Sequence, residues 1–226
     1  DGTWTRQNGG ADGWMGSGAN LIERYNGAGS EGSTMTGAAQ YFFDTSLLRN
    51  VFDSNINVWW QYNKNTKILK IGVNKTDQSN IVTENYTQLP WLRVLGKQAD
   101  GSIDANAARA LIKTVDFQSV VRVDNPAQWF ENYTELTEAY VGSMDVSHAT
   151  SIKSIFNGCT KLYSISGLGN WDTTNVTDMS NVFNGNVFTN VAGLEKWNNK
   201  VANVTTIKGM FANNAFVTTL VGVGGW

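Results

Sequence analysis

Apolar positions in the C-terminal half of the chain recur with a period of 26 to 28 residues. Four phenylalanines mark the copies: Phe130, Phe156, Phe183 and Phe211. In the last three copies, apolar residues also stand four and one positions before the phenylalanine, which is the spacing of one helix face. A threonine precedes each run and can cap the N-terminus of a helix. The pattern therefore predicts one short helix per copy, at 150–156, 177–183 and 205–211.

Helices of about two turns are unstable alone in water, so the copies are expected to pack against one another. Strand-like segments with paired apolar residues lie between the predicted helices: Leu162/Ile165, Val191/Leu194 and Leu220/Val223, with Leu136/Ala139 as a weaker first copy. This alternation of strand and helix at a fixed period predicts a stack of repeats.

The strand-like segments also supply the candidate binding residues. If their paired apolar residues point inward, neighbouring residues point outward. The outward candidates are Glu138, Tyr140, Tyr163 and Glu195. Exposed tyrosines beside acidic residues suit a protein or glycan partner, so these four residues are the predicted binding site.

The residues ahead of the repeats follow other patterns. Val58–Tyr62 alternates and Ile68–Val73 is a compact apolar run, so the two predict a hairpin with a four-residue turn between them. Asp104 is a predicted N-cap for a helix that runs to about Val115. The segment Phe117–Val123 is predicted to be a strand.

The N-terminal segment is rich in glycine. Residues 1–37 hold ten of the 23 glycines, a density that disfavours helix and favours turns or a flexible arm. From 38 to 52 the apolar residues fall in roughly helical register: Tyr41, Leu47, Leu48, Val51 and Phe52.

The predicted fold class is therefore α+β: a solenoid of short strands and short helices, preceded by a β-containing N-terminal cap region. Three parts are expected: a glycine-rich segment of unknown role at 1–54, an entry region with hairpin and helix at 55–129, and repeats at 130–226. The final residues begin a further repeat, so we expect more repeats to follow in a longer parent protein.

The composition excludes several classes of partner and of functional site. A formal charge of −2 and the lack of basic runs argue against nucleic acid as a partner. Cys159 is the only cysteine, which excludes an intramolecular disulfide and a thiolate metal cluster. No apolar run reaches the roughly 18 residues of a membrane span, so membrane insertion is not expected. No pattern predicts a cofactor.

Three features could support catalysis. His148 is the only histidine, but it aligns with the asparagine of later copies, which favours a turn role. Cys159 is expected to be a small buried thiol rather than a nucleophile. Glu131 and Glu135 could form a glycosidase pair but lack a cleft signature, and a solvated face explains them more simply. The chain is therefore predicted not to be an enzyme.

One segment carries a family resemblance. Trp171–Phe183 has the sequence WDTTNVTDMSNVF. It resembles the W-D-T-S-N-V-T-D-M-S-x-M-F signature of BspA-type leucine-rich repeats, which occur in surface proteins of lactic acid bacteria and related Gram-positive bacteria. Trp60–Gly72 and Leu89–Trp91 similarly resemble the region ahead of those repeats. The first repeat departs from the signature, since His148-Ala149 replaces Asn-Val. The resemblance implies a solenoid, an extracellular location with attachment to the cell wall, an adhesive role and no catalytic residues.

These observations predict a non-catalytic adhesion or protein-interaction module. The expected partner is a host extracellular-matrix protein, a mucin or glycan, or another bacterial surface protein. Three alternatives stay open. A carbohydrate-binding module would use Trp4, Trp14 or Trp59 as sugar platforms. A structural spacer would only project another domain, and a cell-wall hydrolase would need a cleft around Glu131 or Glu135.

Overall fold

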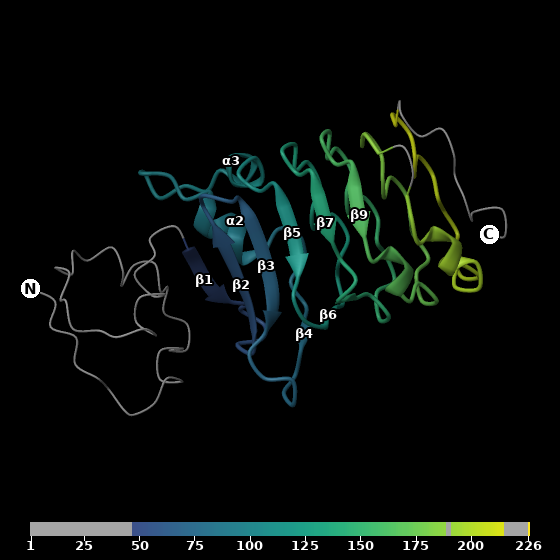
Figure 1. The fold of residues 1–226 in the computed structure, drawn as a ribbon, viewed down its shortest axis with the longest axis horizontal. Helices are drawn as coiled ribbons and strands as arrows, with labels where there is room; N and C mark the ends of the chain where they lie inside the picture. The colour runs from purple at the N-terminus through teal and green to yellow at the C-terminus, as the bar shows by residue number, and fades with distance from the viewer. Residues whose placement is uncertain (1–46, 189–190, 215–225) are drawn as a thin grey trace, which may run out of the picture.

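The computed structural model describes residues 47–188, 191–214 and 226 (Figure 1). A six-stranded sheet contains, in spatial order, β1 (Leu47–Val51), β2 (Val58–Asn63), β3 (Ile68–Val73), β5 (Thr114–Phe117), β7 (Glu138–Tyr140) and β9 (Ser164–Ser166). A three-stranded sheet contains β4 (Ile81–Val82), β6 (Val121–Val123) and β8 (Met144–Asp145). The helices are short: α2 (Pro90–Leu95), α3 (Ala105–Arg109), and the 3₁₀ helices η3 (Leu168–Asn170) and η4 (Leu194–Trp197).

The described chain is thus a mixed α/β structure, mostly strands with few helices, and its strands close no barrel. None of the described helices has the length and apolar character needed to cross a membrane.

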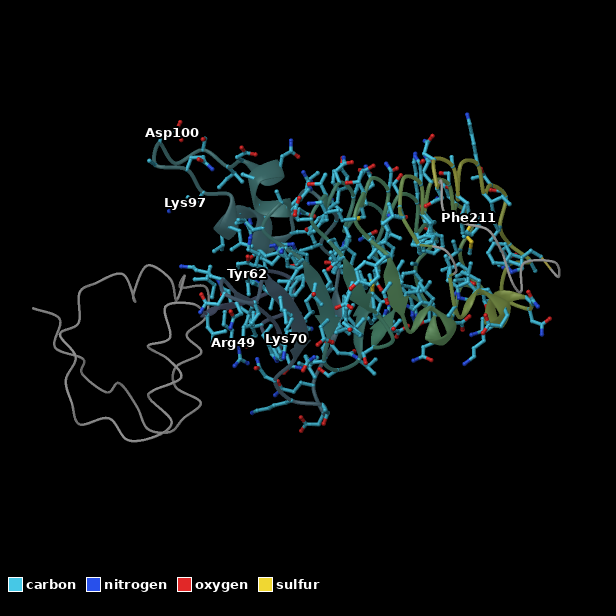
Figure 2. All side chains as sticks on the ribbon, turned by 45° about the horizontal axis from the view of Figure 1, so that its top comes forward. Arg49, Tyr62, Lys70, Lys97, Asp100 and Phe211 are labelled. Atoms are coloured by element: carbon cyan, nitrogen blue, oxygen red, sulfur yellow. The ribbon has the colours of Figure 1, made fainter. Side chains whose placement is uncertain are left out.

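The large sheet changes from antiparallel to parallel along its width. β1, β2 and β3 pair antiparallel, whereas β3, β5, β7 and β9 pair parallel. Two rows of directly opposed residues cross all six strands. The inner row, which packs into the core, is Leu48, Tyr62, Leu69, Val115, Ala139 and Ile165. The outer row is Arg49, Gln61, Lys70, Asp116, Tyr140 and Ser166. Because strand side chains alternate, the two rows lie on opposite faces; Tyr62, Arg49 and Lys70 are labelled in Figure 2.

The predicted hairpin is confirmed, because β2 and β3 pair over six residues each. The roughly helical register of 38–52 does not produce a helix where the structure describes it, since residues 47–51 form β1; residues 38–46 lie outside the described residues. The apolar spacing of this segment fits a helix, but pairing with β2 gives its backbone groups partners in a sheet. β2 begins only seven residues after β1 ends, but the apolar spacing of 38–52 does not reveal this pairing.

The cap at Asp104 is confirmed, since its carboxylate accepts hydrogen bonds from the amides of Asn106 and Ala107 at 3.0 and 2.9 Å. The helix ends at Arg109, however, and does not reach Val115 as predicted. Val115 instead lies on β5, opposite Leu69, where it is fully buried. Burial against a neighbouring strand here outweighs continuation of a helical register.

The predicted strand at Phe117–Val123 is two strands in two sheets. Phe117 ends β5 in the large sheet, and Val121 begins β6 in the small sheet. The residues between them redirect the chain, and the Ser119 hydroxyl accepts a hydrogen bond from the Val73 amide at 2.8 Å. A single apolar run therefore serves both sheets.

The three predicted repeat helices are wrong, because these segments are successions of turns. The amides of the first three repeat phenylalanines donate to the next copy rather than to their own turn: Phe130 to Ile155, Phe156 to Val182 and Phe183 to Met210, at 3.0, 3.1 and 2.9 Å. Residues two before and two after each phenylalanine have positive φ: Gln128, Asn132, Ser154, Gly158, Asn181, Gly185, Gly209 and Asn213. A right-handed helix cannot contain such residues, so alternate amides turn toward the neighbouring copy.

The core is one continuous cluster of buried side chains. The repeat phenylalanines form a column, with ring centroids 5.5, 6.4 and 5.5 Å apart in succession. Trp129 joins this column to the entry region, since it packs against both Phe130 and Phe52. Phe52 is fully buried, so the end of the predicted N-terminal segment packs into the same core as the entry region.

Candidate functional site on the outer face of the sheet

Three of the predicted binding residues meet on the outer face of the large sheet. Glu138 and Tyr140 lie on β7, and Tyr163 immediately precedes β9. The Tyr163 hydroxyl donates to Glu138 Oε1 at 3.0 Å, and the Tyr140 hydroxyl donates to Glu138 Oε2 at 3.4 Å. Tyr140 is 43% exposed and Tyr163 is 54% exposed. We call these residues, Glu138, Tyr140 and Tyr163, the tyrosine–glutamate cluster.

The cluster raises the pKa of both phenols. The negative charge of Glu138 is the main cause for Tyr140, and the hydrogen bond to Glu138 is the main cause for Tyr163. Both hydroxyls therefore stay protonated at neutral pH and hold the carboxylate in place. The result is a charged acceptor between two aromatic rings, on a strand whose backbone is paired on both sides.

Polar groups surround the cluster. Asp116 lies directly opposite Tyr140 on β5, and its Oδ2 accepts from the Gln118 side chain at 2.5 Å. At the other end of the face, Lys161 Nζ contacts both oxygens of Glu135 at 2.6 and 2.8 Å. The hydrogen bond from Lys161 is the main reason that the pKa of Glu135 is lowered. Lys161 therefore forms its ion pair with Glu135 and not with Glu138 of the cluster.

The fourth predicted binding residue lies elsewhere. Glu195 is on η4, and its Oε2 accepts a hydrogen bond from the Gly193 amide at 2.9 Å. The hydrogen bond therefore lies within the turn at residues 193–195 and does not reach the cluster. The prediction assumed a strand at this position, whereas the chain turns through a 3₁₀ helix.

Comparison with known proteins places the cluster within a defined family. A family model described as "Mycoplasma protein of unknown function, DUF285" matches residues 107–221, just over half of the chain. The chain belongs to the DUF285 family. No curated protein matches the chain, and no solved structure matches it. The part matched by DUF285 contains the whole tyrosine–glutamate cluster and Glu195.

The aromatic platform proposed for sugars is partly covered. Trp59, on β2 ahead of the DUF285 segment, is half-buried, and the Arg49 guanidinium lies 4.8 Å from the centre of its ring. A side chain added at Gly72 would come within 2.6 Å of the same ring, so the indole lies across β3. Trp4 and Trp14 lie outside the described residues.

The residues considered for catalysis take separate positions within the DUF285 segment. His148 is exposed, with Nδ1 3.0 Å from the Ser147 hydroxyl. Cys159 is fully buried, its thiol donates to the Phe130 carbonyl, and burial raises its pKa. Glu131 accepts from the side chains of Gln128 and Asn157 at 2.5 and 2.7 Å. The described residues contain no group of three acidic, histidine or cysteine side chains arranged to hold a metal ion.

Glu131 is the end of a side-chain ladder. The Asn184 amide donates to Asn157, and the Asn213 amide donates to Asn184, both at 2.9 Å. Asn157 in turn donates to the carboxylate of Glu131. This carboxylate therefore terminates a row that links the copies, which is a structural use of the residue.

An open cavity of about 290 Å³ lies beside the loop between β4 and α2. The residues that line it are Asn85, Tyr86, Thr87, Asp124, Asn125, Ala127, Gln128, Thr150 and Ser151. Neither Glu131 nor Glu135 lines it, so the cavity does not provide the cleft that a hydrolase would need.

Sequence reasoning missed Asp116 and Gln118 as parts of this face. The error follows from the helix that was extended to Val115, which hid the start of β5 at Thr114. Alternation along Thr114–Phe117 would have placed Thr114 and Asp116 outward, because Val115 and Phe117 are the apolar positions.

Proposed function

We propose that this chain is a non-catalytic binding module of a bacterial cell-surface protein, with the tyrosine–glutamate cluster at the centre of its binding surface. The parent protein is proposed to be extracellular and attached to the cell wall. Its repeats are proposed to form a leucine-rich-repeat solenoid of the BspA type, whose parallel strands present one extended face to partners.

The exposure of two large aromatic side chains on a rigid sheet carries this proposal. Tyr140 and Tyr163 leave about half of their surface exposed, whereas Ala139, which precedes Tyr140 on β7, is buried. Tyrosine loses little conformational entropy on binding and offers both an apolar ring and a polar end, which is why it is frequent in energetically dominant contacts. The hydrogen bonds to Glu138 restrict both side chains before any partner arrives.

The test is binding of the complete chain to immobilised fibronectin, collagen, mucin and a glycan array. The double variant Tyr140→Ala, Tyr163→Ala is compared with Tyr86→Ala, which removes a tyrosine from the loop between β4 and α2. We expect saturable binding that the double variant weakens at least about tenfold and the control leaves within about twofold. Equal binding by both variants would contradict the proposed surface.

A shortened chain ending at residue 129 is unsuited to this test. Trp129 packs against Phe130, and Trp91 donates a hydrogen bond to Tyr133 at 2.8 Å, so the core crosses that boundary. Cutting there would expose apolar side chains and leave a buried indole N–H without its acceptor.

The same assay separates the remaining alternatives. Binding to glycans alone, lost on Trp59→Ala and kept by the double tyrosine variant, would favour a carbohydrate-binding module. Absence of binding to every partner would favour the structural spacer. Turnover of peptidoglycan that is lost on Glu131→Gln or Glu135→Gln would favour the hydrolase.

A further inference from the structure

The outer face of the large sheet divides by charge. Along the outer row, Arg49 on β1 and Lys70 on β3 occupy one half (both labelled in Figure 2). Asp116, in the same row on β5, and Glu138, two residues before Tyr140 on β7 and so on the same face, occupy the other half, where the exposed tyrosines also lie. The second half therefore combines two carboxylates with two aromatic rings.

Within the part of the chain that the structure describes, neither carboxylate has a cationic partner. The ion pairs seen there, such as Arg93–Asp53, Arg122–Asp124 and Lys161–Glu135, include neither Glu138 nor Asp116. Asp116 is instead bonded by the neutral amide of Gln118, and Glu138 by two phenols. The negative charge of this half is thus available to a partner.

The hydrogen-bonding capacity of Glu138 indicates the shape of that partner group. An ionised carboxylate offers about four acceptor positions, and the two phenols use one on each oxygen. One position on each oxygen is left, which suits the two parallel N–H groups of a guanidinium. The flanking rings can add cation–π contact.

The same sheet face already contains such a contact between its own residues. The Arg49 guanidinium lies 4.8 Å from the centre of the Trp59 ring. An arginine stacked on an aromatic ring is therefore compatible with the side-chain spacing of this face.

We propose that the tyrosine–glutamate cluster binds an arginine side chain from an extended segment of a partner protein, which rests on the function proposed above. A second arginine two residues along that segment would lie opposite Asp116. Side chains two apart on an extended chain are separated by about 6.8 Å, and diagonal neighbours on adjacent strands by about 7–8 Å. The expected motif is therefore arginine, any residue, arginine.

The probe is a fluorescent, terminally blocked peptide, Gly-Thr-Arg-Thr-Arg-Thr-Gly, titrated with the complete chain at low salt. Its control carries citrulline in place of both arginines, which keeps the shape and removes the charge. Glu138→Gln is compared with Glu195→Gln, because each removes one carboxylate, half-buried at Glu138 and exposed at Glu195, and only the first lies in the cluster. We expect citrulline and Glu138→Gln each to weaken binding at least about tenfold, and Glu195→Gln to change it less than about twofold.

Several outcomes would overturn the proposal. Equal binding of the citrulline peptide would show that arginine is not recognised, and equal weakening by Glu195→Gln would show only long-range attraction. Self-association of the chain in sedimentation, abolished by Glu138→Gln, would identify a second copy as the occupant. If an array protein binds through Tyr140 and Tyr163 but the arginine peptide does not bind, arginine recognition is wrong while the proposed function stands. If neither binds, both fail.

Discussion

The entry region at 47–129 and the repeats at 130–214 use the same residue types in different ways. In the entry region, aromatic rings meet at mixed angles: Phe52 and Trp91 at 80°, Trp91 and Trp129 at 75°. In the repeats, equivalent rings stack nearly parallel, with Phe156 and Phe183 at 5° and Trp171 and Trp197 at 11°. The first region has an irregular core, and the second has columns.

Backbone hydrogen bonds differ in the same way. In the entry region, the β2–β3 hairpin pairs residues close in sequence. In the repeats, amides donate to carbonyls about 26 to 28 residues away, as Phe156 does to Val182 and Phe183 to Met210. Each copy therefore depends on its neighbours for both its core and its backbone partners. We expect the entry region to unfold as a unit and the repeats to loosen from their C-terminal end.

The largest expected effect tests that difference within the column. Phe183→Ala removes a fully buried ring that stacks on Phe156 and Phe211. Such deletions cost about 3–5 kcal/mol in the free energy of unfolding. Denaturant unfolding with hydrogen exchange should show lost amide protection over 177–214 and retained protection in β2 and β3.

The control for this variant is Ile207→Ala, which truncates a side chain that is 51% exposed in the last described copy. It should change the free energy of unfolding by no more than about 0.5 kcal/mol. Uniform loss of protection after Phe183→Ala, including β2 and β3, would contradict the comparison and show that the chain unfolds as one unit.

A smaller effect is expected where glycines of adjacent copies touch. Gly167 has φ of +95°, and a Cβ there would lie 2.3 Å from the backbone of Gly142. Gly185 has a similar φ of +73°, but its nearest neighbour would be 3.7 Å away. Gly167→Ala should cost about 3 kcal/mol, from strain and overlap together, and Gly185→Ala about 1 kcal/mol, from strain alone. Thermal unfolding of both variants measures the difference, and equal costs would mean that the copies can move apart.

Alkaline pH tests the seam between the two regions. Burial raises the pKa of Tyr133, whose hydroxyl accepts from Trp91, and burial also raises the pKa of Cys159. Because both groups stay protonated in the folded chain, the stability they contribute is complete below their unfolded pKa values and falls as pH rises past them. Those values are about 8.5 for cysteine and 10 for tyrosine.

We therefore expect the free energy of unfolding to fall by about 2 kcal/mol between pH 8 and pH 10, mainly through Cys159. Urea unfolding across this range measures the slope. Cys159→Ala should lower stability at pH 7 but remove most of the slope up to pH 10. An unchanged slope in that variant would assign the loss to other groups.

The amount of this fold that the sequence revealed differs between the regions. The hairpin and the Asp104 cap were predictable because turn and cap signals act over a few residues. The 26- to 28-residue spacing of the repeat phenylalanines was also visible. The short helices were wrong because apolar residues at 152, 155 and 156 fit a helix as well as they fit a series of turns. The series of turns differs from a helix by the positive φ of residues such as Ser154, and a serine in the sequence does not predict positive φ.

The candidate site was recovered in part for related reasons. Glu138 and Tyr140 were found because outward positions on a strand follow from alternation. Asp116 was missed because its strand pairs with a partner 46 residues earlier, Lys70, and a short apolar segment does not reveal that pairing. Glu195 was misplaced because Leu194 was matched with Ile165 of β9, whereas η4 corresponds to η3 of the preceding copy: each follows a glycine with positive φ, Gly167 and Gly193.

The smallest expected effect lies in the entry region. It tests whether the stability of α3 depends on the repeats. Asp104→Ala removes the carboxylate that caps α3, leaving the amides of Asn106 and Ala107 to solvent. Loss of an N-cap costs about 1 kcal/mol. Because α3 packs chiefly against α2, hydrogen exchange should increase in 104–112 alone. Asp104→Asn, which keeps an acceptor oxygen, should restore most of the loss. Increased exchange beyond residue 130 would show instead that the entry helices help to hold the first copy, and that the two regions are coupled more tightly than their separate packing patterns suggest.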